Sequence, residues 1–122
     1  MFNNSILAGK HLISDLYNIK NINLLNNCEE LKSLCRDICI KYNFSILGEL
    51  DYIFTPQGLS FIFLLSESHL SIHTYPERNH ISFDLYTCKE YQNDDDYNNI
   101  IKSLKESLDC NDNTLIINRK FY

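Results

Sequence analysis

The residues of this chain that could do chemistry are concentrated in residues 67–77, which read Glu-Ser-His-Leu-Ser-Ile-His-Thr-Tyr-Pro-Glu. Two histidines, two serines and two glutamates are more polar groups than a passive central strand needs. A serine near a histidine is typical of nucleophilic catalysis, because the imidazole can take up the hydroxyl proton. However, the Gly-x-Ser-x-Gly elbow of many serine hydrolases is absent, and Ser68 precedes an expected strand where the elbow precedes a helix.

Metal binding is a second chemistry that two histidines can support. His69 and His73 are four residues apart, which would bring them together on a helix. On a strand the same spacing places them on one face but well separated. A third ligand is not evident in the sequence, and we therefore expect no metal site.

The five cysteines are an odd number and include no Cys-x-x-Cys pair. This pattern argues against a disulfide framework and against structural zinc. Three cysteines have the spacing of apolar helix positions and are expected in the core, and a fourth is expected at a helix end; these are Cys28, Cys35, Cys39 and Cys110. Cys88 lies apart from them, after a strand with a polar face.

Length and charge narrow the class of protein. A chain of 122 residues, 44% hydrophobic and 22% charged, fits one globular domain. Its formal net charge of −5 argues against a general nucleic-acid binder, which needs a basic surface to neutralise phosphates. No apolar run approaches the roughly 20 residues that span a bilayer, and the first residues lack the pattern of a signal peptide. We therefore expect a cytoplasmic protein that binds neither nucleic acid nor membrane.

Hydrophobic periodicity predicts two helices and six strands in the order β-α-β-β-β-β-α-β. The helices are expected over residues 24–42 and 94–109, the second with Asp94 to Asp96 at its positive N-terminal end. The expected strands cover residues 10–17, 44–55, 59–65, 68–75, 80–87 and 115–117. This order predicts an α+β domain, a two-layer sandwich in which both helices cover one face of a mainly antiparallel sheet.

The other face of the sheet also needs a cover. Residues 59–65 are apolar at almost every position, which predicts a strand buried on both faces. The strands at 68–75 and 80–87 instead alternate, each with one apolar and one polar face. Because two helices cover only one side, the simplest partner for the open side is the same face of a second copy. We therefore expect a homodimer with sheet against sheet and helices outside, an αββα arrangement.

Residues 67–77 and the following Asp84-Leu85-Tyr86-Thr87-Cys88 resemble prokaryotic-type S-adenosylmethionine decarboxylase. The opening segments at residues 9–13 and 15–17 and the segment Pro56-Gln57-Gly58-Leu59-Ser60 are similar to the same family, in the same order. Members of this family are made as proenzymes. The resemblance implies cleavage between Glu67, which supplies the carbonyl, and Ser68, giving chains of residues 1–67 and 68–122.

The resemblance also implies a covalent cofactor. Attack by the Ser68 hydroxyl on the preceding carbonyl turns the amide into an ester, and β-elimination followed by hydrolysis leaves a pyruvoyl group. In the mature enzyme this group would form a Schiff base with S-adenosylmethionine and accept electrons as CO₂ leaves. The product, decarboxylated S-adenosylmethionine, is the aminopropyl donor for spermidine.

Further roles follow from the resemblance residue by residue. His73 matches the family's processing base, and Ser60 matches a second serine that assists processing. Cys88 matches the proton donor, since a thiol with an ordinary pKa of about 8.5 is mostly protonated at neutral pH. Phe54 and Glu77 match substrate-binding positions. We expect Phe54 to stack on adenine and Glu77 to bind ribose hydroxyls or interact with the sulfonium.

Two departures from the family pattern leave alternatives open. Lys89 stands where a glycine often follows the donor cysteine, and Asn18-Ile19 stands where Gly-Cys is common. The same fold and cofactor could therefore serve a decarboxylase of ornithine or arginine. A homologue that is never processed and acts only as a binding partner is a further alternative, and the presence of Ser68, His73 and Cys88 argues against it.

Overall fold

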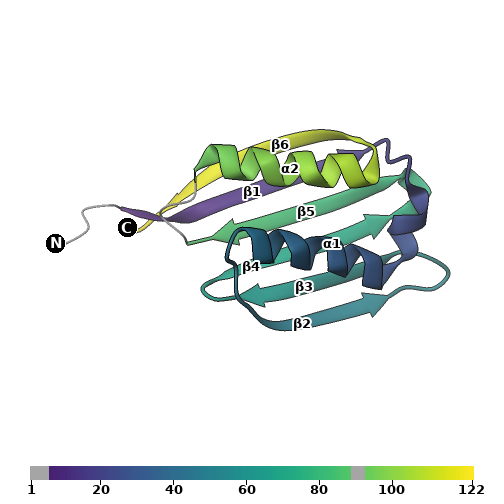
Figure 1. Ribbon diagram of the computed structural model, residues 1–122, viewed down its shortest axis with the longest axis horizontal. Coiled ribbons are helices and arrows are strands. Elements are labelled where there is room, and N and C mark those ends of the chain that lie inside the picture. Colours follow the sequence, from purple (N-terminus) through teal and green to yellow (C-terminus); the bar gives the residue numbers. More distant parts are fainter. Residues whose placement is uncertain (1–5, 89–92) are drawn as a thin grey trace.

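The strands form one antiparallel sheet in the order β2-β3-β4-β5-β1-β6 (Figure 1). The computed structural model describes residues 6–88 and 93–122. Within them the elements are β1 (Leu7–Tyr17), α1 (Cys28–Lys41), β2 (Ile46–Ile53), β3 (Leu59–Leu65), β4 (Ser68–Tyr75), β5 (His80–Thr87), α2 (Asp94–Leu108) and β6 (Asn111–Lys120). Two short 3₁₀ helices lie at Ile22–Asn26 and Pro76–Arg78. The predicted element order and the α+β class are confirmed.

Both α-helices begin at an asparagine cap. The Asn27 side chain accepts a hydrogen bond from the Glu30 amide, and the Asn93 side chain accepts one from the Asp96 amide. Such caps satisfy amide groups that the first helical turn leaves without partners. The expected start of the first helix at residue 24 was wrong, because residues 22–26 form a 3₁₀ helix and α1 starts only after Asn27.

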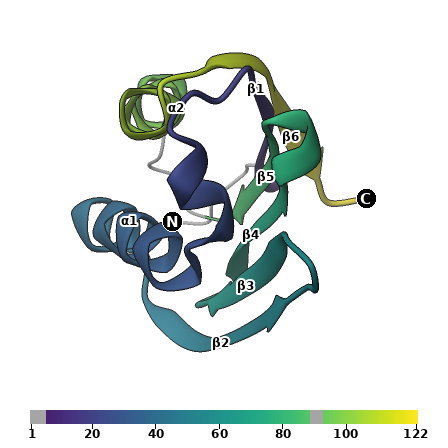
Figure 2. The same cartoon turned by 90° about the vertical axis from the view of Figure 1, so that its right-hand side faces the viewer.

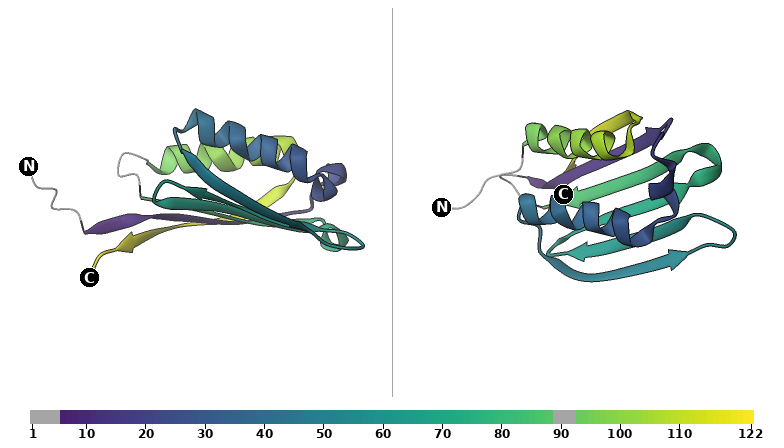
Figure 3. Two further views of the ribbon diagram at one scale, coloured as in Figure 1. Left: turned by 90° about the horizontal axis from the view of Figure 1, so that it is seen from below. Right: turned by 45° about the vertical axis from the view of Figure 1, so that its right-hand side comes forward.

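Both helices lie on the same side of the sheet, as expected (Figures 2 and 3). They bury alternate residues of every central strand, including Leu12, Phe63, Leu70 and Phe83. The predicted core positions of Cys28, Cys35 and Cys39 are confirmed, since each is less than 10% exposed. In the described residues, no helix is both long and apolar enough to cross a membrane.

The opposite, open face of the sheet carries apolar side chains without a cover in the single chain. In β3, the residues Phe61 and Phe63 are buried, whereas Ile62 and Leu64 on the other face are 42% and 58% exposed. The expectation that this strand is buried on both faces is therefore wrong for one chain, because the two helices cover only one side. Other exposed apolar residues on the outer strands β2 and β6 are Leu50, Tyr52, Leu115 and Ile117.

A glycine allows the start of β1 to approach the end of β5 closely. A Cβ atom on Gly9 would clash with the Thr87 carbonyl oxygen and would lie 2.8 Å from the Tyr86 hydroxyl oxygen. Gly48 in β2 is different, because a Cβ atom there would meet nothing within 4 Å. The contact at Gly9 matters for the site described next, since Thr87 directly precedes Cys88.

We predict that Gly9→Ala lowers the free energy of unfolding by about 1–3 kcal/mol, the usual effect of overpacking against a fixed backbone atom. Gly48→Ala, as the matched control, should change it by about 0.5 kcal/mol or less. Urea denaturation at one fixed protein concentration measures both. Equal effects of the two substitutions would contradict the packing described for Gly9.

Candidate active site

The first part of the candidate site lies at the turn between β3 and β4. Leu65 pairs with Ser68 across this turn, which leaves only Ser66 and Glu67 to connect the strands. Glu67 has φ = 58°, a left-handed conformation that is unfavourable for a residue with a side chain. The residue pair at which the resemblance implies cleavage is therefore the last residue of a strained turn and the first residue of a strand.

The Ser68 side chain lies on the helix side of the sheet, and the residue is only 6% exposed. Its hydroxyl oxygen accepts a hydrogen bond of 3.3 Å from the peptide N–H of Cys88. The Cys88 thiol donates to a carboxylate oxygen of Glu67, also at 3.3 Å. Burial, and next the Glu67 carboxylate, raise the pKa of the Cys88 thiol, so it is protonated at neutral pH. Lys89 lies outside the described residues.

A buried polar pair supports the end of β5. The hydroxyl groups of Thr87 and Tyr97 are hydrogen bonded, and both residues are fully buried. Tyr97 projects from α2, so this contact ties the helix to the strand end that carries Cys88. Burial raises the pKa of the Tyr97 phenol. The sequence indicated Tyr97 only as one residue of an apolar helix stripe, because its partner lies on another element.

The second part of the candidate site lies on the open face, at the far end of β4. His73 on β4 pairs with Ser60 on β3, and the Ser60 hydroxyl and the His73 Nδ1 are 2.6 Å apart. Phe54 and Glu77 line the same cavity of about 320 Å³ as these two residues. The structure thus brings together four residues from three separate segments of the chain. Phe54 is 48% exposed, which leaves its ring available to a ligand.

The two parts do not meet within one chain. His73 is five residues further along β4 than Ser68, which corresponds to about 16 Å along a strand. The alternation of the strand also puts the buried Ser68 and the exposed His73 on opposite faces. A change of side-chain rotamer cannot bridge such a distance while β4 stays paired with its neighbours. His73 therefore cannot act on Ser68 of its own chain in this fold.

A third polar group occupies the centre of the open face and was not assigned from the sequence. His11 Nε2 lies 3.2 Å from a carboxylate oxygen of Asp84, and the rings of His11, His69 and Tyr86 have centroids 5.8–6.0 Å apart. Strand alternation indicates the faces of these residues, but only the register of β1, β4 and β5 makes them neighbours. Among the described residues, no three His, Cys, Asp or Glu side chains gather closely enough to hold a metal ion.

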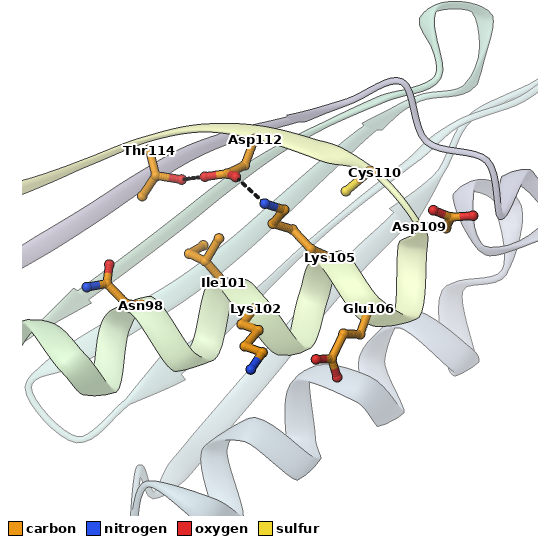
Figure 4. A pocket seen from close by; sticks show the side chains of 9 residues that line it. All are labelled: Asn98, Ile101, Lys102, Lys105, Glu106, Asp109, Cys110, Asp112 and Thr114. Atoms are coloured by element: carbon orange, nitrogen blue, oxygen red, sulfur yellow. Dashed lines mark hydrogen bonds and ion pairs between the residues drawn. The ribbon is translucent and has the colours of Figure 1, made fainter.

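A further cavity, of about 490 Å³, lies between α2 and β6 and contains none of the candidate residues (Figure 4). Lys105 reaches from the helix to Asp112 on β6 at 2.9 Å, and Thr114 donates a hydrogen bond to the same carboxylate (Figure 4). The Thr114 hydroxyl, and next Lys105, lower the pKa of Asp112. The paired side chains of Lys105, Asp112 and Thr114 in this cavity connect the helix to the edge strand.

The departure from the expected pattern at Asn18 falls on a residue with a left-handed backbone. Asn18 follows β1 with φ = 54°, in the left-handed region that favours glycine. Asparagine is among the residues that tolerate this region best, so Asn18 can hold this conformation without a glycine. Ile19, which stands in place of cysteine, is 2% exposed and belongs to the core.

Comparison with known proteins gives a consistent result. A family model described as S-adenosylmethionine decarboxylase matches residues 10–115. The S-adenosylmethionine decarboxylase proenzyme of Picrophilus torridus is 37% identical over 103 residues, covering 82% of this chain and 77% of that relative. The proenzyme of Brevibacillus brevis is 42% identical over 82 residues, covering 67% of this chain and 61% of that relative.

Two further comparisons cover most of both molecules. The S-adenosylmethionine decarboxylase proenzyme of Clostridium botulinum strain Loch Maree is 34% identical over 101 residues, or 83% of this chain and 84% of that relative. The crystal structure of the adenosylmethionine decarboxylase from Aquifex aeolicus superposes with a TM-score of 0.81 at 23% identity. It covers 95% of this chain and 93% of that structure, and it supports the fold.

The open-face histidines predict a pH-dependent stability. Burial, and next the neighbouring His11, lower the pKa of His69 in the folded chain. The unfolded chain therefore binds more protons in the window below the ordinary histidine pKa of about 6.5, and stability falls as pH falls through that window. We predict that the free energy of unfolding decreases between about pH 7.5 and pH 5.5, and that His69→Gln reduces this decrease.

Urea denaturation at each pH measures this effect. Ser71→Ala on the same face removes no titrating group and should retain the pH dependence of the original chain. An unchanged pH dependence in His69→Gln would show that His69 does not titrate as described.

Proposed function

The chain belongs to the S-adenosylmethionine decarboxylase family, and we propose that it is a proenzyme that cleaves itself and then decarboxylates S-adenosylmethionine. The observation that carries the proposal is the arrangement at the β3–β4 turn. There a buried serine hydroxyl directly follows a left-handed Glu67 and accepts a hydrogen bond from the Cys88 amide. The sequence relatives support the reaction type, and the contacts of Ser68, Glu67 and Cys88 are consistent with the roles that the resemblance implies for them.

The proposed cleavage separates residues 1–67 from residues 68–122. The Ser68 oxygen attacks the Glu67 carbonyl carbon, the peptide C–N bond breaks, and an ester forms. A base then removes the α-proton of residue 68, which expels the Glu67 carboxylate and leaves dehydroalanine. Hydrolysis releases ammonia and leaves a pyruvoyl group at residue 68. The left-handed Glu67 backbone favours this sequence, because cleavage removes a strain of about 1–2 kcal/mol.

The residues around Ser68 fit a pyruvoyl group. When formed, this group supplies a carbonyl that binds the substrate amine and takes up the electrons released with CO₂. The Cys88 amide that bonds the Ser68 hydroxyl is released by the elimination, because the hydroxyl oxygen leaves as part of the Glu67 carboxylate, and it is then available to a nearby carbonyl or carboxylate oxygen. The protonated Cys88 thiol lies beside it and is suited to deliver a proton to the carbon that has lost CO₂.

The cavity at the other end of β4 fits the nucleoside part of S-adenosylmethionine. The exposed Phe54 ring offers a surface for adenine, and the Glu77 carboxylate can bind ribose hydroxyls or interact with the sulfonium. A basic amino acid such as ornithine or arginine has no ring to stack on Phe54. The arrangement of this cavity therefore favours S-adenosylmethionine, and the product would be the aminopropyl donor for spermidine.

The separation of the two parts points to a homodimer as the working unit. The open face carries exposed apolar residues on β2, β3 and β6, as an interface between two copies would require. If two open faces pack with their β4 strands antiparallel, the end of β4 that carries His73 in one copy lies over the start of β4 in the other. In this arrangement Ser60 and His73 of the partner subunit lie at the Ser68 end of β4. For them to act on residue 68, its side chain must turn from the helix side to the open face.

We predict that Ser68→Ala blocks both cleavage and CO₂ release, because alanine has no oxygen to attack the carbonyl or to leave by elimination. Denaturing mass spectrometry of the original chain should give two fragments, the second starting with pyruvate. Cys88→Ala is the matched control, expected to cleave and yet to turn over poorly. A single intact chain after prolonged incubation would contradict the proposal that the protein is a self-cleaving enzyme. Release of CO₂ from ornithine or arginine, but not from S-adenosylmethionine, would contradict the proposed substrate.

Complementation between variants tests the shared site. We expect Ser68→Ala and His73→Ala each to fail to cleave, or to cleave slowly, when expressed alone. Co-expression produces mixed dimers in which an intact Ser68 faces an intact His73, so part of the His73→Ala chains should be cleaved. The control is co-expression of Ser68→Ala with the double variant Ser68→Ala/His73→Ala, which contains no intact Ser68. Mixed dimers without cleavage would mean that both residues must belong to the same chain.

A further inference from the structure

Glu67 contacts the candidate proton donor in addition to supplying the carbonyl at the cleavage point. Its carboxylate oxygen Oε2 accepts the hydrogen bond from the Cys88 Sγ at 3.3 Å. The peptide N–H of the same cysteine donates to the Ser68 hydroxyl, also at 3.3 Å. The two residues that flank the cleavage point therefore hold Cys88 through two different groups, its thiol and its amide.

This contact depends on the turn conformation and on the strand register. The pairing of His69 with Tyr86 brings the end of β5 beside the start of β4, which places Cys88 next to the β3–β4 turn. The left-handed backbone of Glu67 is part of the same turn. Glu67 and Cys88 are 21 residues apart in the chain, so their contact follows from the fold and not from local sequence.

We propose that Glu67 is a positioning residue whose carboxylate orients the Cys88 thiol proton beside the reactive centre. This inference rests on the proposed function, since it assigns to Glu67 a part in the reaction that follows cleavage. The side chain of Glu67 is not consumed in that cleavage, which changes only its backbone carbonyl. The carboxylate therefore remains on the last residue of the first chain, where it can keep its contact with the thiol.

The surroundings of the thiol agree with this role. Burial and then the Glu67 carboxylate raise the pKa of Cys88, whereas the Ser68 hydroxyl lowers it. The titratable Tyr97 phenol on α2 also lies within electrostatic range of the thiol. In the part of the chain that the structure describes, Glu67 is the carboxylate that acts on this thiol. A protonated thiol can donate a proton, and it does not compete with the Ser68 hydroxyl as a nucleophile, because the thiolate is the reactive form.

The rate at which iodoacetamide alkylates Cys88 tests this inference without requiring activity. The experiment compares Ser68→Ala with Ser68→Ala/Glu67→Gln, both of which keep the chain intact, and follows each cysteine by peptide mass spectrometry at several pH values. Loss of the negative charge lowers the thiol pKa, so Cys88 should be alkylated several-fold faster at neutral pH. Cys110, on which Glu67 has no effect, serves as the internal control. Ser68→Ala/Glu77→Gln, with the charge removed from the other part of the site, should match Ser68→Ala.

Kinetics of the cleaved protein give an independent measurement. Glu67→Gln should still cleave, since glutamine supplies the same backbone carbonyl. Its kcat should fall, and the alkaline limb of its pH–rate profile should move to lower pH, because the proton donor loses its proton earlier. A purely structural role of Glu67 would lower the rate without moving that limb.

The inference is overturned if Ser68→Ala/Glu67→Gln, folded by circular dichroism, has the same Cys88 alkylation rate at every pH as Ser68→Ala. That outcome leaves the proposed function standing. Failure of the original chain to cleave would overturn the proposed function. The alkylation rates of the intact chains would still show whether Glu67 acts on the Cys88 thiol.

Discussion

The position of β4 between β3 and β5 is the constraint on which the rest of the structure depends. Antiparallel pairing on both sides fixes the direction and register of this strand, so Ser68 and His73 stay about 16 Å apart. Ser68 lies at one end beneath the helices, and His73 lies at the other end on the open face. The sheet therefore separates Ser68 from His73, and the proposed homodimer would bring the His73 end of β4 in one copy to the Ser68 end of β4 in the other.

The open face has the properties that such a contact needs. Its outer strands carry exposed leucine, isoleucine and tyrosine side chains, while its centre carries the pair of His11 and Asp84. Apolar flanks provide the area that drives association, and a polar centre restricts how two copies can align. In the proposed dimer, formation of the interface would complete the site, and we expect a monomeric precursor to remain uncleaved.

Much of the fold could be predicted from the sequence because its signals are local. The alternation in β4 and β5 indicated which residues face the core, and the apolar spacing of Cys28, Cys35 and Cys39 indicated the buried side of α1. The candidate residues could be named from motif spacing, but their arrangement could not. The left-handed conformation of Glu67 is not indicated by a glycine, and the contacts of Cys88 with Glu67 and Ser68 depend on the pairing of β4 with β5. The expected strand over residues 68–75 implied only the separation of Ser68 and His73.

The dependence of the cleavage rate on protein concentration tests the central claim most directly. Freshly refolded chain would be sampled over time by denaturing mass spectrometry at a series of dilutions, with sedimentation reporting the oligomeric state at each one. A site shared between two chains predicts that the first-order cleavage rate rises with concentration and levels off where the dimer is fully formed. The same rate at dilutions where the chain is a monomer, or no cleavage at any concentration, would contradict the account.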